Sequence, residues 1–202
     1  MKRDARLNTP NLLTLFRIVV IPVVVLLLYV PDGEISFPRS MAAFILFLVA
    51  TLTDLLDGYL ARRYRMVTPL GKLLDPLADK LLVCASMIML VPPGRVPAWV
   101  VVIIVAREIG VTALRGVAST EGVIIAASSL GKAKTLLLNI GVAALILHYP
   151  FFGLDAVFGP RFVHWFGIGF LAGGIVLTAW SGLDYFFRFL GEVFHREKPG
   201  RP

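Results

Sequence analysis

A long apolar run near the start of the chain decides its fold. Residues 12–30 read LLTLFRIVVIPVVVLLLYV, and Arg17 is the one charged side chain among them. A helix needs about 20 mostly apolar residues to cross the hydrocarbon core of a bilayer. The run has this length, and the polar turn at 31–34 that follows it offers no small-residue cleavage site. We therefore expect a retained membrane helix here and not a removable signal peptide.

Five more apolar runs of similar length follow, separated by segments that contain proline or glycine. Charged residues make up 16% of the 202-residue chain, compared with about 25% in an average soluble domain. The sequence thus predicts an all-α, polytopic membrane protein, with a single domain over residues 1–202 and about six transmembrane helices. The expected spans are Leu12–Val30, Ser40–Arg62, Leu70–Val91, Val96–Ala118, Leu130–Tyr149 and Phe162–Leu190, and residues 119–130 are expected to form a loop.

Basic residues are divided unevenly between the two sides of the membrane that six spans would create. Both termini lie on one side, which collects 17 of the 20 lysines and arginines, and Arg39, Arg95 and Arg161 lie on the other. Because loops rich in lysine and arginine stay in the cytoplasm, we expect a multi-pass cell-membrane protein with cytoplasmic termini. Topology and contact with anionic lipid explain the net charge of +7, so nucleic acid is not expected as a partner.

Four aspartates interrupt the expected second and third spans, where each would cost about 2.5–3.5 kcal/mol at a helix centre. Asp54 and Asp57 stand at positions i and i+3, and Asp75 and Asp79 at i and i+4, so each pair shares one helix face. Ion pairs with nearby arginines, or exposure at the interface, would compensate single aspartates without explaining this spacing. Converging carboxylates favour hard cations such as Mg²⁺, Mn²⁺ or Ca²⁺. The pattern predicts a two-metal site for phosphoryl transfer at the cytoplasmic face or, as the alternative, a divalent-cation transporter.

The aspartates belong to a longer pattern. Residues 54–62 read DLLDGYLAR, eight residues follow, and residues 71–79 read GKLLDPLAD. This arrangement resembles the signature of the CDP-alcohol phosphatidyltransferase family, whose eight fixed positions all match within 26 residues. The start of the chain, TPNLLTLFR at residues 9–17, is similar to the opening of the same family.

Two later segments resemble one branch of this family, the phosphatidylglycerophosphate synthases. Residues 106–115 read AREIGVTALR and residues 131–135 read GKAKT. After Thr135 the branch continues with more polar residues and ends near a glutamine, whereas this chain continues as LLLN. The resemblance implies transfer of a phosphatidyl group from CDP-diacylglycerol to glycerol 3-phosphate, with release of CMP. Inositol phosphate, serine and phosphatidylglycerol stay open as alternative acceptors.

The resemblance also implies roles for the aspartates. Asp54 and Asp75 bridge two Mg²⁺ or Mn²⁺ ions, Asp57 completes one metal site and Asp79 completes the other. Asp79 is in addition the general base that takes the proton of the acceptor hydroxyl. A second set of residues binds CDP-diacylglycerol, with small residues that leave room for the nucleotide and polar residues that contact it. This donor-binding set is Asn11, Thr14, Gly58, Ala61, Arg62, Thr68 and Gly71.

Basic residues of the fourth and fifth expected spans are candidates for binding the acceptor phosphate. The set is Arg107, Arg115, Lys132 and Lys134. Arg107 lies eleven residues after Val96, deep in an apolar run, where snorkelling to the interface is the alternative role. Charge-assisted hydrogen bonds from arginine and lysine suit a phosphate group, and Glu108 is expected to orient one arginine. The expected partners are CDP-diacylglycerol, glycerol 3-phosphate and membrane lipids, together with a second copy of the chain, because the family tends to form homodimers.

Overall fold

The computed structural model consists of long helices. It describes residues 9–31, 33–64, 69–120, 129–149, 157–159 and 161–196. Within these ranges the side chains at 9–14, 54–64, 69–77, 79, 115, 118–120, 129–130, 188–190 and 192–196 are not described. The described ranges contain no strand, which confirms the all-α expectation. The helices are α1 (Thr9–Leu28), α2 (Phe37–Tyr64), α3 (Pro69–Met89), α4 (Ala98–Thr120), α5 (Ser129–Leu147) and α7 (Phe162–Arg196).

These six helices coincide with the six expected apolar runs, and their ends differ from the expected ends by a few residues. α2 begins at Phe37 instead of Ser40, because Pro38 suits the first turn of a helix, where its missing N–H leaves no bond unmade. α7 continues past Leu190 to Arg196. The expected loop at 119–130 is shorter on both sides, since α4 runs to Thr120 and α5 starts at Ser129, and residues 121–128 lie outside the described part.

Large apolar side chains are exposed on all six of these helices, among them Leu26, Trp99 and Trp180, each more than 60% exposed. Soluble monomers confine such side chains to small patches. The segment Phe162–Phe187 of α7 has 26 residues and is long and apolar enough to cross a membrane by itself. Within the described residues, Leu15–Leu28, Phe37–Thr53 and Lys80–Met89 are shorter apolar helical segments. This apolar surface fits a protein that is embedded in a membrane.

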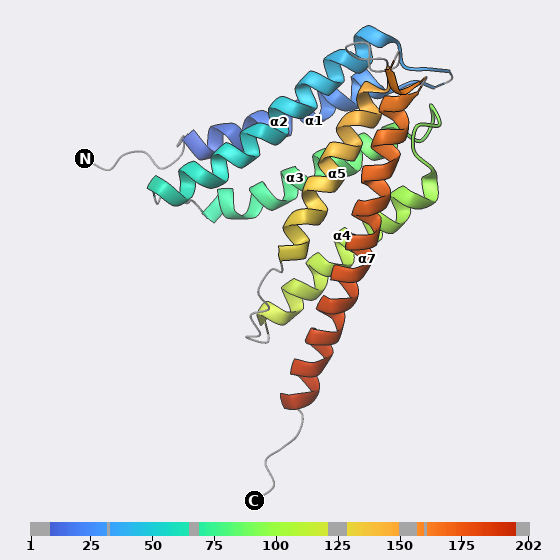
Figure 1. Cartoon of the computed structure of the whole chain (residues 1–202). Coiled ribbons are helices and arrows are strands. Elements are labelled where there is room, and N and C mark those ends of the chain that lie inside the picture. The colour runs from blue at the N-terminus through green and yellow to red at the C-terminus, as the bar shows by residue number, and fades with distance from the viewer. Residues whose placement is uncertain are drawn as a thin grey trace, which may run out of the picture.

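α5 lies along α7, and the two helices approach each other closely (Figure 1). Glycines make this approach possible. A Cβ atom at Gly141 would lie 2.9 Å from the backbone nitrogen of Leu171, and one at Gly167 would lie 2.8 Å from Cγ of Leu145. Small residues at helix contacts let backbones come together in the way that membrane proteins commonly use. The pairing fixes α7 beside the start of α5, where the basic residues of the candidate site lie.

Arg95 joins three parts of the chain near the end of α5 and the start of α2. Arg95 is 2% exposed, and its guanidinium donates hydrogen bonds to Ser40 Oγ at 3.0 Å and to the carbonyl oxygen of Ile146 at 2.7 Å. Further bonds reach the carbonyl oxygens of Leu145 and Ile35, both at 3.3 Å. Burial lowers the pKa of Arg95, and the nearby Tyr149 and Glu34 oppose that shift. Arg95 thereby caps the C-terminus of α5, where the helix dipole favours a cation.

The Arg95→Met variant is expected to lose about 3 kcal/mol of unfolding free energy, because several buried acceptors would be left without a donor. Thermal unfolding of the purified protein in detergent measures this loss. The matched control is Arg39→Met. Arg39 also donates to helix carbonyl oxygens, those of Leu26 at 2.9 Å and Tyr29 at 2.7 Å, but these bonds are exposed to the surroundings. Equal destabilisation by the two variants would contradict the capping role of Arg95.

Candidate active site

In α2, the first two aspartates of the signature lie on the same helix face as a row of buried residues. Ala43, Phe47 and Ala50 are completely buried on one face of α2. Asp54 and Asp57 follow Ala50 at positions i+4 and i+7, which are on the same face of a helix. The side chains of these two aspartates lie outside the described part. Their backbone positions are in register with the buried residues Ala43, Phe47 and Ala50.

α3 repeats this arrangement for the other two aspartates. Ala78 and Leu82 are each 2% exposed, and Asp75 and Asp79 occupy neighbouring positions on the same helix face. α2 and α3 contact each other. Carboxylates are the donor set that hard divalent cations prefer, so the four residues fit such a metal by their chemistry and register. The described side chains themselves contain no cluster of three or more metal-binding residues, since all four aspartate side chains lie outside them.

The predicted donor-binding residues are distributed over the same helices. α1 carries Asn11 and Thr14 in its first turns, α2 carries Gly58, Ala61 and Arg62 near its end, and α3 carries Gly71 near its start. Their side-chain positions lie outside the described part, and Thr68 lies outside it altogether. The donor-binding roles of these seven residues therefore stay predictions.

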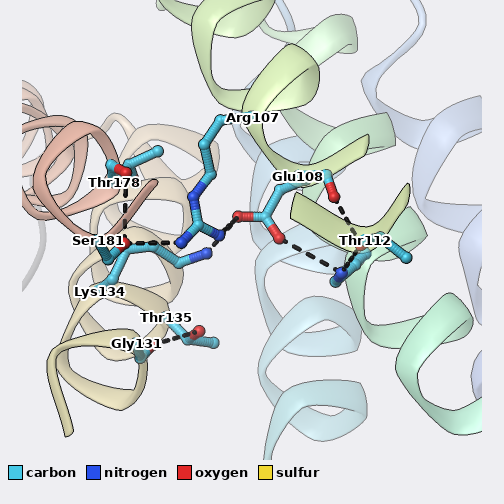
Figure 2. Close-up of polar contacts among 9 residues, drawn as sticks. Arg107, Glu108, Thr112, Gly131, Lys134, Thr135, Thr178 and Ser181 are labelled. Atoms are coloured by element: carbon cyan, nitrogen blue, oxygen red, sulfur yellow. Dashed lines mark hydrogen bonds and ion pairs between the residues drawn. The ribbon is translucent and has the colours of Figure 1, made fainter. Parts of the chain in front are cut away.

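A cluster of ionic contacts, here named the Glu108 cluster, joins three helices (Figure 2). It consists of Lys80 from α3, Arg107 and Glu108 from α4, and Lys134 from α5. Lys134 Nζ donates to Glu108 Oε1, and Arg107 NH1 lies 3.1 Å from the same oxygen. Lys80 Nζ lies 3.6 Å from Glu108 Oε2. The expectation that Glu108 orients one arginine is confirmed by its bond to Arg107.

The Glu108 cluster is largely withdrawn from the surface and carries an excess of positive charge. The side chains of Lys134, Glu108 and Arg107 are 6%, 12% and 17% exposed. Among the described side chains, three cations surround one carboxylate, which leaves a net charge of +2 on the cluster, and Lys80, with 33% of its side chain exposed, is the least buried of the three. Buried cations in excess favour a bound anion, because charge that is shielded from water is costly unless it is paired. The cluster therefore has the composition of a site for an anion of about two negative charges, the charge of a phosphate monoester near neutral pH.

The structure does not place the other two predicted acceptor residues in this cluster. Lys132 is exposed and lies at a groove on the far side of α5's first turns. Arg115 follows Val111 by one helical turn in α4, and its side chain lies outside the described part. The structure thus brings together Arg107 and Lys134 from the predicted acceptor set and adds Lys80.

An apolar groove of about 730 Å³ runs between α2, α5 and the start of α7. The polar residues of the lining lie in the parts of α2 and α5 nearest the aspartates and the Glu108 cluster. They are Thr51, Lys132, Thr135 and Asn139. Towards the opposite end the lining is apolar and includes Leu147, Phe162 and Phe166. A groove that is polar at one end and apolar along its length fits an amphipathic ligand, such as a lipid, better than a small polar solute.

Comparison with known proteins identifies the family. The sequence profile of CDP-alcohol phosphatidyltransferases matches residues 7–180. The chain belongs to the CDP-alcohol phosphatidyltransferase family. Members of this family are enzymes, are typically embedded in membranes and generally depend on divalent metal ions. The family resemblance inferred from the aspartate signature is therefore confirmed.

Several relatives have specific names. The chain is 42% identical over 187 residues to the CDP-diacylglycerol–glycerol-3-phosphate 3-phosphatidyltransferase of Bacillus subtilis, covering 89% of this chain and 93% of that protein. It is 38% identical to a probable phosphatidylglycerophosphate synthase of Mycobacterium tuberculosis, covering 92% of this chain and 83% of the relative. A 3-phosphatidyltransferase of Rickettsia typhi with the same name as the Bacillus protein is 44% identical over 140 residues, which are 69% of this chain and 76% of that one.

Two polar residues of the site were not singled out from the sequence. In the sequence, Lys80 is only one of many basic residues expected on the cytoplasmic side, although it directly follows Asp79. Ser181 lies in the apolar part of α7 and accepts a hydrogen bond from Arg107 NH2 at 2.7 Å (Figure 2). A hydroxyl in an apolar helix is a weak signal for a polar contact between helices, and it does not identify the partner.

Proposed function

We propose that this protein transfers the phosphatidyl group of CDP-diacylglycerol to glycerol 3-phosphate, giving phosphatidylglycerophosphate and CMP. The observation that carries this acceptor assignment is the Glu108 cluster, in which Arg107, Lys134 and Lys80 leave a net charge of +2 around one carboxylate. Glycerol 3-phosphate offers a phosphate of matching charge, whereas serine and free glycerol do not. Inositol phosphate offers the same group, so the choice between these two acceptors rests on the relatives. The names of the relatives support the same acceptor.

The donor phosphates are held beside the aspartates of α2 and α3 in this proposal. Asp54 and Asp75 hold both metal ions, Asp57 holds one and Asp79 the other. When bound, two Mg²⁺ or Mn²⁺ ions supply neutralising charge for the pyrophosphate and the leaving CMP. Asp79 takes the proton from the acceptor hydroxyl as general base. A carboxylate is a weak base, so much of the rate comes from holding the two substrates in line.

The remaining polar residues orient the two substrates. Arg62 and Thr68 contact the nucleotide phosphates or ribose, and Asn11 and Thr14 contribute from α1. Gly58, Ala61 and Gly71 keep space for the nucleotide between the helices. Arg107 and Lys134 hold the acceptor phosphate from α4 and α5, Arg115 contributes to the same phosphate site from α4, and Lys132, which lies at the groove, contributes less.

The apolar groove between α2, α5 and α7 is proposed to hold an acyl chain of the lipid. An Ile140→Trp substitution in the groove lining should raise the KM for long-chain CDP-diacylglycerol about tenfold, the effect of losing contact with about two methylene groups at roughly 0.8 kcal/mol each. A donor with short acyl chains should be affected less. Val176→Trp, on an exposed face of α7 outside the groove lining, is the control. Equal KM values for wild type and the Ile140 variant with the long-chain donor would contradict this use of the groove.

The six helices are proposed to cross the cell membrane, as one domain over residues 1–202 that forms a homodimer, with both termini and the active site in the cytoplasm. The exposed apolar side chains on all six helices and the distribution of basic residues support this topology.

Single cysteines test the topology in a Cys84→Ala background, because Cys84 is the only native cysteine. A cysteine replacing the exposed Ala133, or Met66, should react with a membrane-impermeant maleimide only after the cells are permeabilised. A cysteine replacing the exposed Glu34 should react in intact cells. Labelling of position 133 in intact cells would reverse the proposed orientation.

The experiment that tests the reaction type follows CMP release by purified protein in CDP-diacylglycerol vesicles. Glycerol 3-phosphate should be required for rapid release, since the acceptor displaces CMP. CMP release that proceeds at the same rate without any acceptor would indicate hydrolysis. The complete absence of CMP release with metal, donor and acceptor present would remove the proposed reaction.

A further inference from the structure

α7 reaches the Glu108 cluster through one hydroxyl group. Ser181 is 5% exposed and accepts a hydrogen bond from Arg107 NH2 at 2.7 Å. The Ser181 hydroxyl donates its own hydrogen to the carbonyl oxygen of Thr178 at 3.3 Å, one turn earlier in α7 (Figure 2). Because the hydroxyl proton is directed at Thr178, the oxygen lone pairs are directed at the guanidinium.

Arg107 is therefore held from two sides. Its NH1 contacts Glu108 on the same helix at 3.1 Å, and its NH2 contacts Ser181 on α7. Gly182 packs beside the same side chain, since a Cβ atom there would lie in ordinary van der Waals contact, 3.5 Å from Arg107 Cγ. Two fixed contacts on a planar guanidinium restrict its rotation as well as its position. An arginine held in this way loses less conformational freedom when it binds a ligand than a free one does.

Ser181 lies outside the sequence motifs from which the family resemblance is drawn. The family profile ends at residue 180, and none of the sequence motifs that carry the resemblance includes α7. The contact between α4 and α7 is nevertheless part of the fold. This contact thus supports a residue of the proposed acceptor site from a helix that carries none of the quoted motifs.

We propose that Ser181 is a positioning residue that orients Arg107 for the acceptor phosphate. This inference rests on the proposed function, in which Arg107 binds glycerol 3-phosphate. Ser181 acts through Arg107 and makes no contact with the reacting atoms. Its loss should weaken acceptor binding and leave the donor site unchanged.

The test compares steady-state kinetics of the full-length Ser181→Ala protein with wild type. Because Ser181 acts only through Arg107, its loss should cost less than a direct contact with the ligand and should raise the KM for glycerol 3-phosphate about three- to tenfold. The kcat and the KM for CDP-diacylglycerol should change less than twofold. Ser181→Thr keeps the hydroxyl and should restore most of the affinity. The matched control is Ser86→Ala, because Ser86 is also buried and its Oγ has no hydrogen-bond partner among the residues that the structure describes.

A double-mutant cycle with Arg107→Gln separates this inference from the proposed function. If Arg107→Gln leaves the KM for glycerol 3-phosphate unchanged, the acceptor assignment itself fails. If Arg107→Gln raises that KM but Ser181→Ala does not, the role of Ser181 is overturned while the acceptor site stands. An undiminished effect of Ser181→Ala in the Arg107→Gln background would also overturn it. Should the alanine variant fail to fold, Ser181→Cys, a similar volume with a weaker hydrogen-bonding group, is expected to show the same selective rise in KM.

Discussion

Replacing Asp75 by asparagine should lower the kcat for CMP release by about a thousandfold or more, because several kcal/mol of charge stabilisation depend on a residue that serves both metal ions. The asparagine keeps the size of the side chain and removes its charge. Asp54→Asn should have an effect of the same order, since the proposal gives Asp54 the same bridging role. For the wild-type protein, EDTA should abolish activity, and added Mg²⁺ or Mn²⁺ should restore it.

Glu34→Gln is the matched control for these substitutions. Glu34 is an exposed carboxylate in the segment between α1 and α2, at the opposite ends of these helices from the aspartates. Its replacement should leave kcat within about twofold. A second readout is thermal stabilisation of the protein by Mn²⁺, which the Asp75 variant should lose. Full activity of Asp75→Asn would remove the two-metal proposal, even if the family assignment stands.

Lys134→Met should raise the KM for glycerol 3-phosphate about ten- to 150-fold, which corresponds to the loss of roughly 1.5–3 kcal/mol from one charge-assisted contact. Lys134 is the most buried cation of the Glu108 cluster, with 6% of its side chain exposed. Methionine retains the apolar stem and removes the charge. The KM for CDP-diacylglycerol should change little, because the donor phosphates are proposed to be held at the aspartates.

Lys132→Met gives an informative comparison for Lys134→Met. The two lysines are two residues apart in α5, and Lys132 is exposed and lies at the groove instead of the cluster. Its replacement should raise the KM for glycerol 3-phosphate less than the loss of Lys134 does. Arg161→Gln, an exposed position outside both sites, is the neutral control. If Lys134→Met raises the KM for CDP-diacylglycerol and leaves the KM for glycerol 3-phosphate unchanged, Lys134 belongs to the CDP-diacylglycerol site.

The sequence predicts the helices well because each apolar run is long and is bounded by strong turn signals. It predicts less well where tertiary contacts decide the outcome. Arg95 and Arg17 illustrate this limit. The charge pattern counts both among topology-determining basic residues, yet they are 2% and 1% exposed. For Arg95, no periodicity indicates that the C-terminal carbonyls of α5 come within reach of its guanidinium.

The same distinction applies to the candidate site. Spacing alone assigns Asp54, Asp57, Asp75 and Asp79 to paired helix faces, because the relevant distances lie within one or two turns of a helix. The acceptor site instead combines residues from separate helices, so spacing cannot identify all of its members. Lys80 enters the Glu108 cluster from α3 and Ser181 supports it from α7. Both contacts depend on how the helices pack against one another.

The most direct test of the proposed function is an acceptor panel with radiolabelled CDP-diacylglycerol and chromatography of the lipid product. Purified protein with Mg²⁺ or Mn²⁺ receives glycerol 3-phosphate, inositol phosphate, serine or phosphatidylglycerol in separate reactions. Labelled phosphatidylglycerophosphate should form with glycerol 3-phosphate, at a kcat/KM at least about a hundredfold above that of any other acceptor, a difference of roughly 2.7 kcal/mol. A labelled product that forms preferentially with another acceptor, with no phosphatidylglycerophosphate, would contradict the proposed reaction.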